Sequence, residues 1–137
     1  MGKSIREVMT SQVKACEPTA TVVDAAKLMA QEDVGPIPIV EEGRLVGIVT
    51  DRDIVVNAVA KGTDVNTATV GDIASRDLVT ISPDDDMNDA LNLMAEKQVR
   101  RLPVVEGDRL VGIVAQADIA RTGRDKKTGE VVEEISR

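Results

Sequence analysis

An internal repeat is the feature of this sequence that most constrains its fold. The run Leu-Val-Gly-Ile-Val occurs at residues 45–49 and again at residues 110–114, an offset of 65 residues. At this offset residues 5–55 align with residues 70–120 without a gap, and 18 of the 51 aligned positions are identical. A repeat of fixed period indicates one supersecondary unit that occurs twice and packs against its copy. We therefore predict repeat 1 at residues 5–60, a linker at 61–69, repeat 2 at 70–122 and a charged tail at 123–137.

Both copies show the same order of secondary-structure signals. A short β-type run leads to a proline, Pro18 or Pro83, and then to a stretch with apolar residues at helical spacing. Two short apolar runs joined by acidic and glycine turns then predict a hairpin, and a second helix follows. The predicted runs, hairpins and second helices are residues 13–16, 37–50 and 51–60 in the first copy, and 78–81, 102–115 and 116–122 in the second.

The predicted unit is β-α-β-β-α, which places the chain in the α/β class. A unit of ~50 residues with three short strands is marginal alone, because small domains bury too little surface. We therefore expect the two copies to pack face to face about a pseudo-twofold axis, with Val46, Ile48, Val111 and Ile113 in the core.

The composition excludes many kinds of active site. The 137 residues include no Phe, Trp, Tyr or His. Without imidazole there is no Ser-His-Asp triad, no Cys-His pair and no His-ligated metal. Without aromatic rings there is no base-stacking platform and no aromatic cage for a cation. The single Cys16 forms neither an internal disulfide nor a CxxC metal site, so we expect no enzyme and no metal site.

Charge and hydropathy predict the location and exclude some partners. The formal net charge is −7 and the pI is about 4.6, so nucleic acid is not an expected partner, nor is an anionic membrane. No segment approaches the ~20 apolar residues that a membrane span needs, and the first residues lack the apolar stretch of a signal peptide. A single cysteine is typical of a reducing compartment, so a cytoplasmic protein is expected.

The motifs resemble a known family. The order proline, amphipathic helix, residues 37–40 (Ile-Pro-Ile-Val) and residues 44–53 (Arg-Leu-Val-Gly-Ile-Val-Thr-Asp-Arg-Asp) resembles the CBS domain, and residues 100–118 repeat it. The tandem pair resembles a Bateman module of the stand-alone two-CBS type, and the resemblance covers residues 5–120. It implies two repeats packed by a pseudo-twofold, homodimers, and AMP, ADP, ATP or S-adenosylmethionine bound in clefts between the repeats.

The ligand-site pattern of this family is Gly-hydrophobic-x-Thr/Ser-x-x-Asp, and the first copy matches it with Gly47, Ile48, Thr50 and Asp53. A carboxylate in the first helical turn can accept two hydrogen bonds from a ribose diol, and N–H groups at a helix start favour phosphate. The same spacing equally predicts a capping box, with Thr50 as the N-cap and Asp53 at position N3.

The second copy differs at two places. Ala115 replaces the hydroxyl while Asp118 remains, which favours a ligand role for the carboxylate, although the helix dipole also favours an acid there. Arg100 and Arg101 precede the strand where the first copy has Gly35-Pro36. The resemblance implies that a basic residue here reaches nucleotide phosphates. The alternative is a solvated surface or ion pairs with this acidic chain.

Further residues are candidates either for contact with the adenine ring or for structural roles in the core and at helix starts. The adenine ring would lie against Val34, Pro36 and Ile37 and against residues 15–17 and 80–82, which alternatively belong to the core. For three further features we predict structural roles: Asp84, Asp85 and Asp86 at a helix start, Met29 and Met94 in the core, and Cys16 in a buried strand.

Two functions remain open. The first is a small regulatory module that binds an adenosine-containing ligand and signals to a separate effector protein that the sequence does not identify. The alternative is a ligand-free structural or interaction module that acts through its dimer surface. Exposed apolar residues on the second helix, Ile54, Val55 and Val59, would form that surface.

Overall fold

The structure is a computed structural model that describes residues 3–125. The chain forms two compact units, one of residues 14–78 and one that combines residues 1–13 with residues 79–137. The predicted charged tail lies outside the described residues except for its first three, which belong to the last helix. No helix in the described part is long and apolar enough to cross a membrane.

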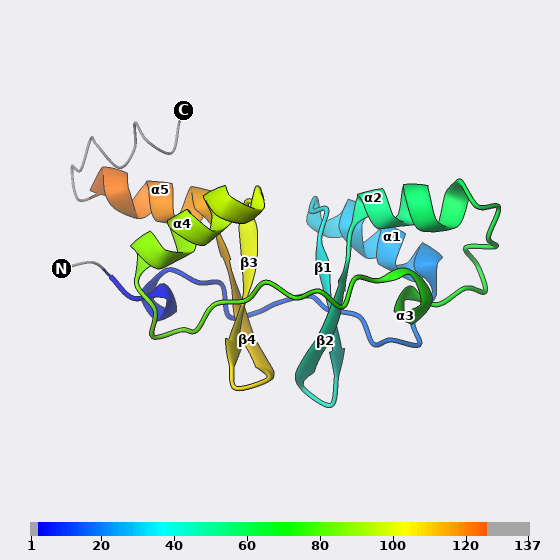
Figure 1. Cartoon of the computed structure of the whole chain (residues 1–137), viewed down its shortest axis with the longest axis horizontal. Helices are drawn as coiled ribbons and strands as arrows, with labels where there is room; N and C mark the ends of the chain where they lie inside the picture. The colour runs from blue at the N-terminus through cyan, green and yellow to red at the C-terminus, as the bar shows by residue number, and fades with distance from the viewer. Residues whose placement is uncertain (1–2, 126–137) are drawn as a thin grey trace. The chain divides into compact units, whose positions relative to one another are not determined.

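The unit of residues 14–78 has the predicted order of elements, except that the predicted first strand, residues 13–16, is only an isolated bridge (Figure 1). A parallel bridge joins the segment before its first helix to the hairpin, because Cys16 donates its N–H to the Pro38 carbonyl (3.0 Å) and accepts from Val40 N–H (2.8 Å). Its elements are α1 (Val22–Glu32), β1 (Ile37–Glu41), β2 (Arg44–Val49), α2 (Asp51–Ile54), the π-helical η2 (Val55–Val59) and α3 (Val70–Ile73).

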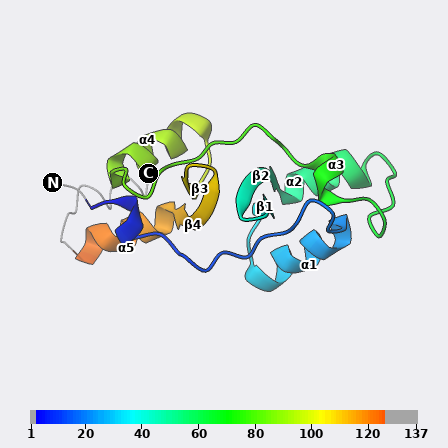
Figure 2. The same ribbon diagram turned by 90° about the horizontal axis from the view of Figure 1, so that it is seen from below.

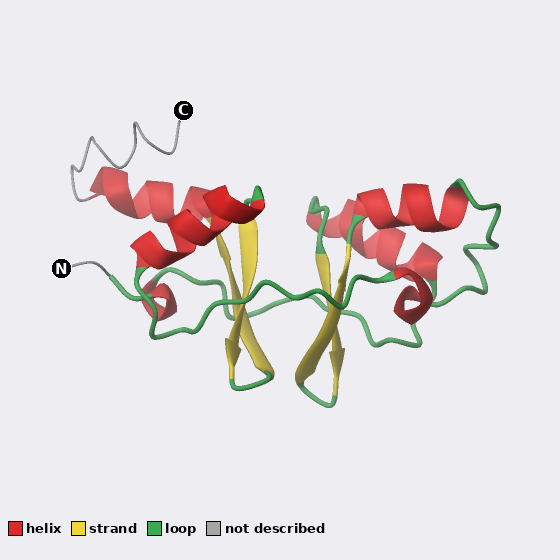
Figure 3. Ribbon diagram, viewed as in Figure 1, coloured by secondary structure: helices red, strands yellow, loops and turns green. Residues whose placement is uncertain are grey.

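The other unit repeats this architecture (Figure 3). Ile81 bridges to β3 as Cys16 does to β1, and the second helix of this unit is a regular α-helix where the first copy passes into a π-helix. In each unit both main helices lie on the same side of the antiparallel hairpin (Figure 2). The elements are the 3-10 helix η1 (Ile5–Glu7), α4 (Met87–Lys97), β3 (Arg101–Glu106), β4 (Arg109–Ala115) and α5 (Gln116–Asp125).

The leading segment of each sequence repeat packs in the compact unit of the other repeat. Thr10 and Ile113 exchange backbone hydrogen bonds of 2.8 and 2.9 Å, so the N-terminal segment lies against β4. Ser75 and Ile48 exchange equivalent bonds of 2.9 and 3.0 Å, so the segment after α3 lies against β2. The compact units therefore have different boundaries from the sequence repeats.

This close approach explains the glycine in each Leu-Val-Gly-Ile-Val run. A Cβ on Gly112 would lie 2.8 Å from the Thr10 carbonyl oxygen, and a Cβ on Gly47 would lie 3.2 Å from that of Ser75. At 2.8 Å a side chain at position 112 would collide with the N-terminal segment. At 3.2 Å a side chain at position 47 would fit only tightly against the segment after α3. Gly112 therefore permits the close approach of two backbones, and Gly47 provides a tight fit at the equivalent place.

Each unit has its own apolar core. The first cluster consists of Cys16, Ala25, Met29, Ile37, Ile39, Val49 and Val70. The second consists of Ile5, Ile81, Ala90, Met94, Leu102, Val104, Val114 and Ile119. The predictions that Cys16, Met29 and Met94 are buried are confirmed.

The expected core positions on the second strand of each hairpin are confirmed only in part. Val46 and Val111 are half-buried and pack against the cluster of their own unit, whereas Ile48 and Ile113 are half-buried and belong to neither cluster. Successive side chains of a strand point to opposite faces, and on β2 the helices cover the face of Leu45, Gly47 and Val49.

The acidic run before α4 organises the start of that helix, as predicted. Asp86 is the N-cap and accepts a hydrogen bond from Asn88 N–H (3.0 Å). Asp85 accepts one from Ser82 N–H (3.0 Å) in the preceding turn. These carboxylates therefore satisfy backbone donors that a helix start leaves unpaired.

Candidate functional site

The strongest candidate site lies where β2 ends and α2 begins. Thr50 is the N-cap of α2, and its Oγ1 accepts a hydrogen bond from Asp53 N–H (3.0 Å). In return Asp53 Oδ2 accepts one from Thr50 N–H (2.9 Å). Both halves of the capping box are therefore present, and the capping interpretation is confirmed.

The capping box uses only one oxygen of the Asp53 carboxylate. Among residues 3–125 the other oxygen, Oδ1, has no hydrogen-bond or ion-pair partner, and the residue is half-buried. An ionised carboxylate offers about four lone-pair sites. Asp53 can therefore cap the helix and still accept hydrogen bonds from a ligand.

The loop before β1 comes close to this helix start. A Cβ on Gly35 would lie 3.1 Å from Asp51 Oδ1, so Gly35 brings the loop against the first residue of α2. Asp51 was not predicted as a site residue. The available signal was its position directly after Thr50, where the second copy has Gln116.

The other predicted residues of the first copy differ in what they expose. Ile37 has only 1% of its surface exposed and belongs to the core, so it can meet a ligand only through its backbone. Val34 is half-buried and packs against the same core, and Pro36 is half-buried. Gly47 is buried and Ile48 uses both its backbone groups on Ser75, so these two residues position the end of β2.

In the second copy Asp118 also caps its helix. Its Oδ2 accepts a hydrogen bond from Ala115 N–H (3.3 Å), although the hydroxyl of the box is missing. Its Oδ1 pairs with the Arg121 guanidinium. The presence of this acid without a hydroxyl partner therefore does not require a ligand role, because half of the box survives.

Arg100 and Arg101 lie next to the same helix start. The Arg100 carbonyl accepts a hydrogen bond from Gln116 N–H (2.9 Å), and Arg101 pairs with Ala115 in the β3–β4 register. Both side chains are exposed, and neither forms an ion pair within residues 3–125. The structure thus gathers Arg100, Arg101 and Asp118 in one unit and the candidates from Val34 to Asp53 in the other.

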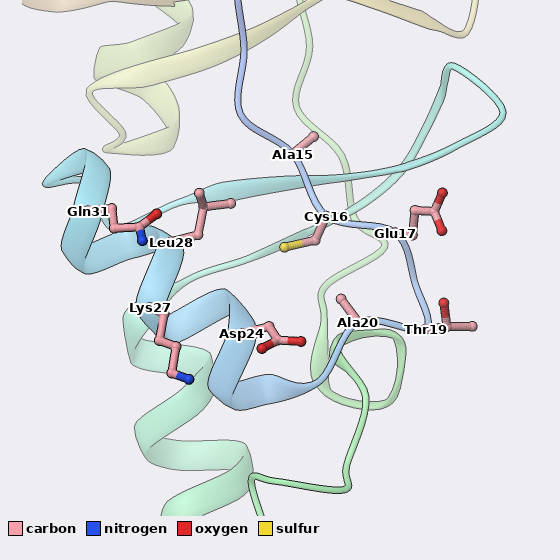
Figure 4. Close-up of a pocket in the computed structure, with 9 residues that line it drawn as sticks. All are labelled: Ala15, Cys16, Glu17, Thr19, Ala20, Asp24, Lys27, Leu28 and Gln31. Atoms are coloured by element: carbon pink, nitrogen blue, oxygen red, sulfur yellow. The ribbon is translucent and has the colours of Figure 1, made fainter.

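A surface depression of about 450 Å³ lies elsewhere in the unit of residues 14–78, between α1 and the segment before it (Figure 4). Cys16 lies at this depression, where burial and the negative charge of Asp24 raise the pKa of its thiol. A protonated thiol is a poor nucleophile, which agrees with the predicted structural role. The lining residues are Ala15, Cys16, Glu17, Thr19, Ala20, Asp24, Lys27, Leu28 and Gln31, so Thr50 and Asp53 do not contribute.

Metal-ligating side chains do not gather in the described part of the chain. Between residues 3 and 125 no three or more His, Cys, Asp or Glu residues are placed to hold a metal ion. The acidic residues before α4 bind backbone N–H groups instead.

The repeated β-α-β-β-α units, each with an acid three residues after the end of its hairpin, define a tandem-repeat α/β protein. The chain belongs to the CBS domain family, whose pattern matches residues 5–59 and 70–125. It is similar to the CBS domain-containing protein YhcV of Bacillus subtilis, at 46% identity over 117 residues that cover 85% of this chain and 83% of YhcV. Hypoxic response protein 1 of Mycobacterium tuberculosis is 43% identical over 117 residues, covering 85% and 82%.

Solved structures confirm the predicted fold class. The crystal structure of Hypoxic Response Protein I with two coordinated zinc ions matches with a TM-score of 0.79 at 41% identity, over 88% of this chain and 98% of that one. The structure of CBSX2 with AMP matches with a TM-score of 0.81 at 26% identity, over 92% and 99%. A CBS domain pair solved with 5′-methylthioadenosine and S-adenosyl-L-methionine matches with a TM-score of 0.77 at 28% identity, over 92% of this chain and 99% of that one.

Proposed function

We propose that this protein is a stand-alone regulatory module that binds an adenosine-containing ligand and signals to a separate protein. The observation that supports it best is the Oδ1 of Asp53, which has no partner among the described residues and lies beside a helix start that is already capped. AMP, 5′-methylthioadenosine and S-adenosylmethionine, the ligands of the two similar structures, all contain a ribose with vicinal hydroxyls. A carboxylate oxygen is a strong acceptor for those hydroxyls.

In this proposal each of the remaining candidate residues has one kind of ligand group to bind. Asp53 accepts the ribose hydroxyls, and the Thr50 hydroxyl contacts the ribose or the first phosphate. Arg100 and Arg101 bind phosphates, because a guanidinium presents paired donors that match phosphate oxygens. Half-buried Val34 and Pro36 contact the adenine ring. AMP, ADP and ATP carry phosphates that the arginines can bind, whereas S-adenosylmethionine carries none.

Melting temperatures of the whole chain with adenosine, AMP, ADP, ATP and S-adenosylmethionine test the proposal. A ligand at a hundred times its Kd stabilises by about 2.7 kcal/mol, which raises the Tm of a two-state chain of this size by roughly 9 °C. Arg101→Ala should reduce the shift by ATP more than the shift by adenosine. If no ligand raises the Tm at millimolar concentration, the proposal is wrong and the ligand-free alternative stands.

The same proposal includes the absence of catalysis and a cytoplasmic location. The match to inosine-5′-monophosphate dehydrogenase of Methanocaldococcus jannaschii, 34% identical over 133 residues, spans only 26% of that enzyme. The Thr50 hydroxyl accepts a hydrogen bond from Asp53 N–H, and among the described residues no side chain accepts one from it. The single, buried thiol is compatible with a reducing compartment.

A second candidate function, an interaction module acting through a dimer, is favoured by one specific surface. This surface consists of three exposed valines of η2: Val55 (58% exposed), Val56 (43%) and Val59 (59%). Ile54, which was also predicted to belong to it, packs against the core instead. A second copy of the chain would cover such an apolar patch by an isologous contact.

Light scattering at micromolar concentration tests the dimer. We expect twice the 14.6 kDa chain mass for the wild type. The double variant Val55→Asp, Val59→Asp should be monomeric, while Val99→Asp, another exposed valine, should not change the mass. A wild-type monomer would rule out this surface as a homodimer interface.

A further inference from the structure

The two repeats differ in the partner of one carboxylate oxygen. Asp53 and Asp118 occupy equivalent positions, and each uses Oδ2 to accept a hydrogen bond from the residue that ends its hairpin. The Oδ1 of Asp118 is paired with Arg121, whereas that of Asp53 has no partner within residues 3–125. The residue equivalent to Arg121 in the first repeat is Val56, which cannot form this pair.

We infer that Arg121 closes the second repeat to a ribose diol, so that each chain has a single high-affinity adenosine site, at Asp53. This inference rests on the proposed function. The Arg121 guanidinium donates to the oxygen that a ribose hydroxyl would need, and the Asp118 side chain is only 18% exposed. The guanidinium already uses one lone pair of this oxygen, so a ribose that donates both of its hydroxyls to Oδ1 must displace it.

The absence of a hydroxyl at Ala115 also lowers the affinity of the second repeat for the ligand. Thr50 offers a ligand an oxygen that the second repeat does not have. Displacing an ion pair whose Arg121 side chain is 68% exposed costs a factor of a few in affinity, because such pairs are weak. One absent hydrogen bond costs a similar factor. Together they make the second repeat about tenfold weaker than the first.

Isothermal titration calorimetry with AMP on the whole chain measures the number of sites. We expect one tight site and one about tenfold weaker in each wild-type chain, loss of the tight site in Asp53→Ala, and an unchanged tight site in Asp118→Ala. The double variant Ala115→Thr, Arg121→Val gives the second repeat the residues of the first and should bind a second AMP with an affinity within a few-fold of the first. Lys61→Val, which removes a positive charge from an exposed turn, should keep one tight site.

The outcomes separate this inference from the proposed function. If the wild type has two sites of equal affinity and Asp118→Ala loses one of them, the proposed ligand is retained and the role of Arg121 is overturned. AMP binding by the double variant alone would support the role of Arg121 and overturn the site at Asp53. If the double variant melts like the wild type and binds one AMP tightly, the Arg121–Asp118 ion pair does not control ligand binding and the inference is wrong. Absence of binding in every variant would overturn both.

Discussion

Asp53 caps a helix and, in our proposal, also binds a ribose, and two substitutions can separate these two roles. Asp53→Ala removes both carboxylate oxygens, so it removes the cap on Thr50 N–H (2.9 Å) and the proposed ribose acceptor. Asp53→Asn keeps one oxygen, which can still accept from Thr50 N–H, but the negative charge and the second acceptor are lost. The two variants should therefore agree in ligand affinity and differ in stability.

The expected magnitudes follow from the two kinds of hydrogen bond. Loss of a helix cap costs about 1 kcal/mol, which for a two-state chain of this length lowers the Tm by roughly 3–4 °C. Asn keeps a neutral version of the cap, so Asp53→Asn should lower the Tm by less than about 2 °C. Loss of the charged acceptor costs roughly 1.5–3 kcal/mol of binding, or about ten- to a hundredfold in Kd for both variants.

Calorimetric titration with the ligand found by the thermal screen, together with melting curves of the ligand-free variants, measures both quantities. Asp72→Asn is the control, because it removes one carboxylate charge from an exposed residue of α3 in the same compact unit. Wild-type affinity in Asp53→Asn would refute the ribose role. An unchanged Tm in Asp53→Ala would refute the capping box.

Two further predictions concern residues outside the proposed ligand site. Gly112→Ala should destabilise the protein by more than Gly47→Ala in urea unfolding, because its Cβ would lie 2.8 Å from a carbonyl oxygen instead of 3.2 Å; equal losses would show that both crossings relax. The raised pKa of Cys16 means that the unfolded chain loses the thiol proton at lower pH than the folded chain. The Tm of the wild type should therefore fall relative to that of Cys16→Ala as pH rises above the usual thiol range, and parallel curves would contradict this.

The secondary structure was predictable because local signals agree with the fold. The turns at Gly43 and Gly107 have positive φ, which the sequence signals with glycine between short apolar runs. Thr21 caps α1 through Asp24 N–H (3.2 Å), as its spacing suggests. Such signals depend on neighbouring residues alone, and tertiary contacts did not override them.

The buried face of β2 was not predictable in the same way. Its residues are apolar on both faces, so alternation does not indicate which face the helices cover. The small residue Gly47 lies on the covered face, while the larger Val46 and Ile48 are half-buried. Side-chain size therefore does not indicate which face the helices cover, because the close approach of Ser75 favours a small residue at position 47.

The exchange of leading segments has the same kind of cause. Because the two repeats are copies, the segment with Thr10 and the segment with Ser75 are each compatible with the second strand of either hairpin. Sequence identity cannot decide between pairing with the near copy and pairing with the far one. The structure joins each segment to the second strand of the other repeat's hairpin, through pairs of backbone hydrogen bonds that carry no sequence signal.

The sequence predicts either capping or ligand binding for Asp53, and the geometry makes the two roles compatible. The cap fixes the carboxylate through Oδ2, so a ligand that binds Oδ1 meets an acceptor whose rotamer is already held. Asp118 is fixed in the same way, yet its second oxygen is paired with Arg121. In our proposal the residue three positions further along the helix decides between a ligand site and a structural cap. This residue is Val56 in one repeat and Arg121 in the other. The family's ligand-site pattern ends at the Asp and therefore does not include it.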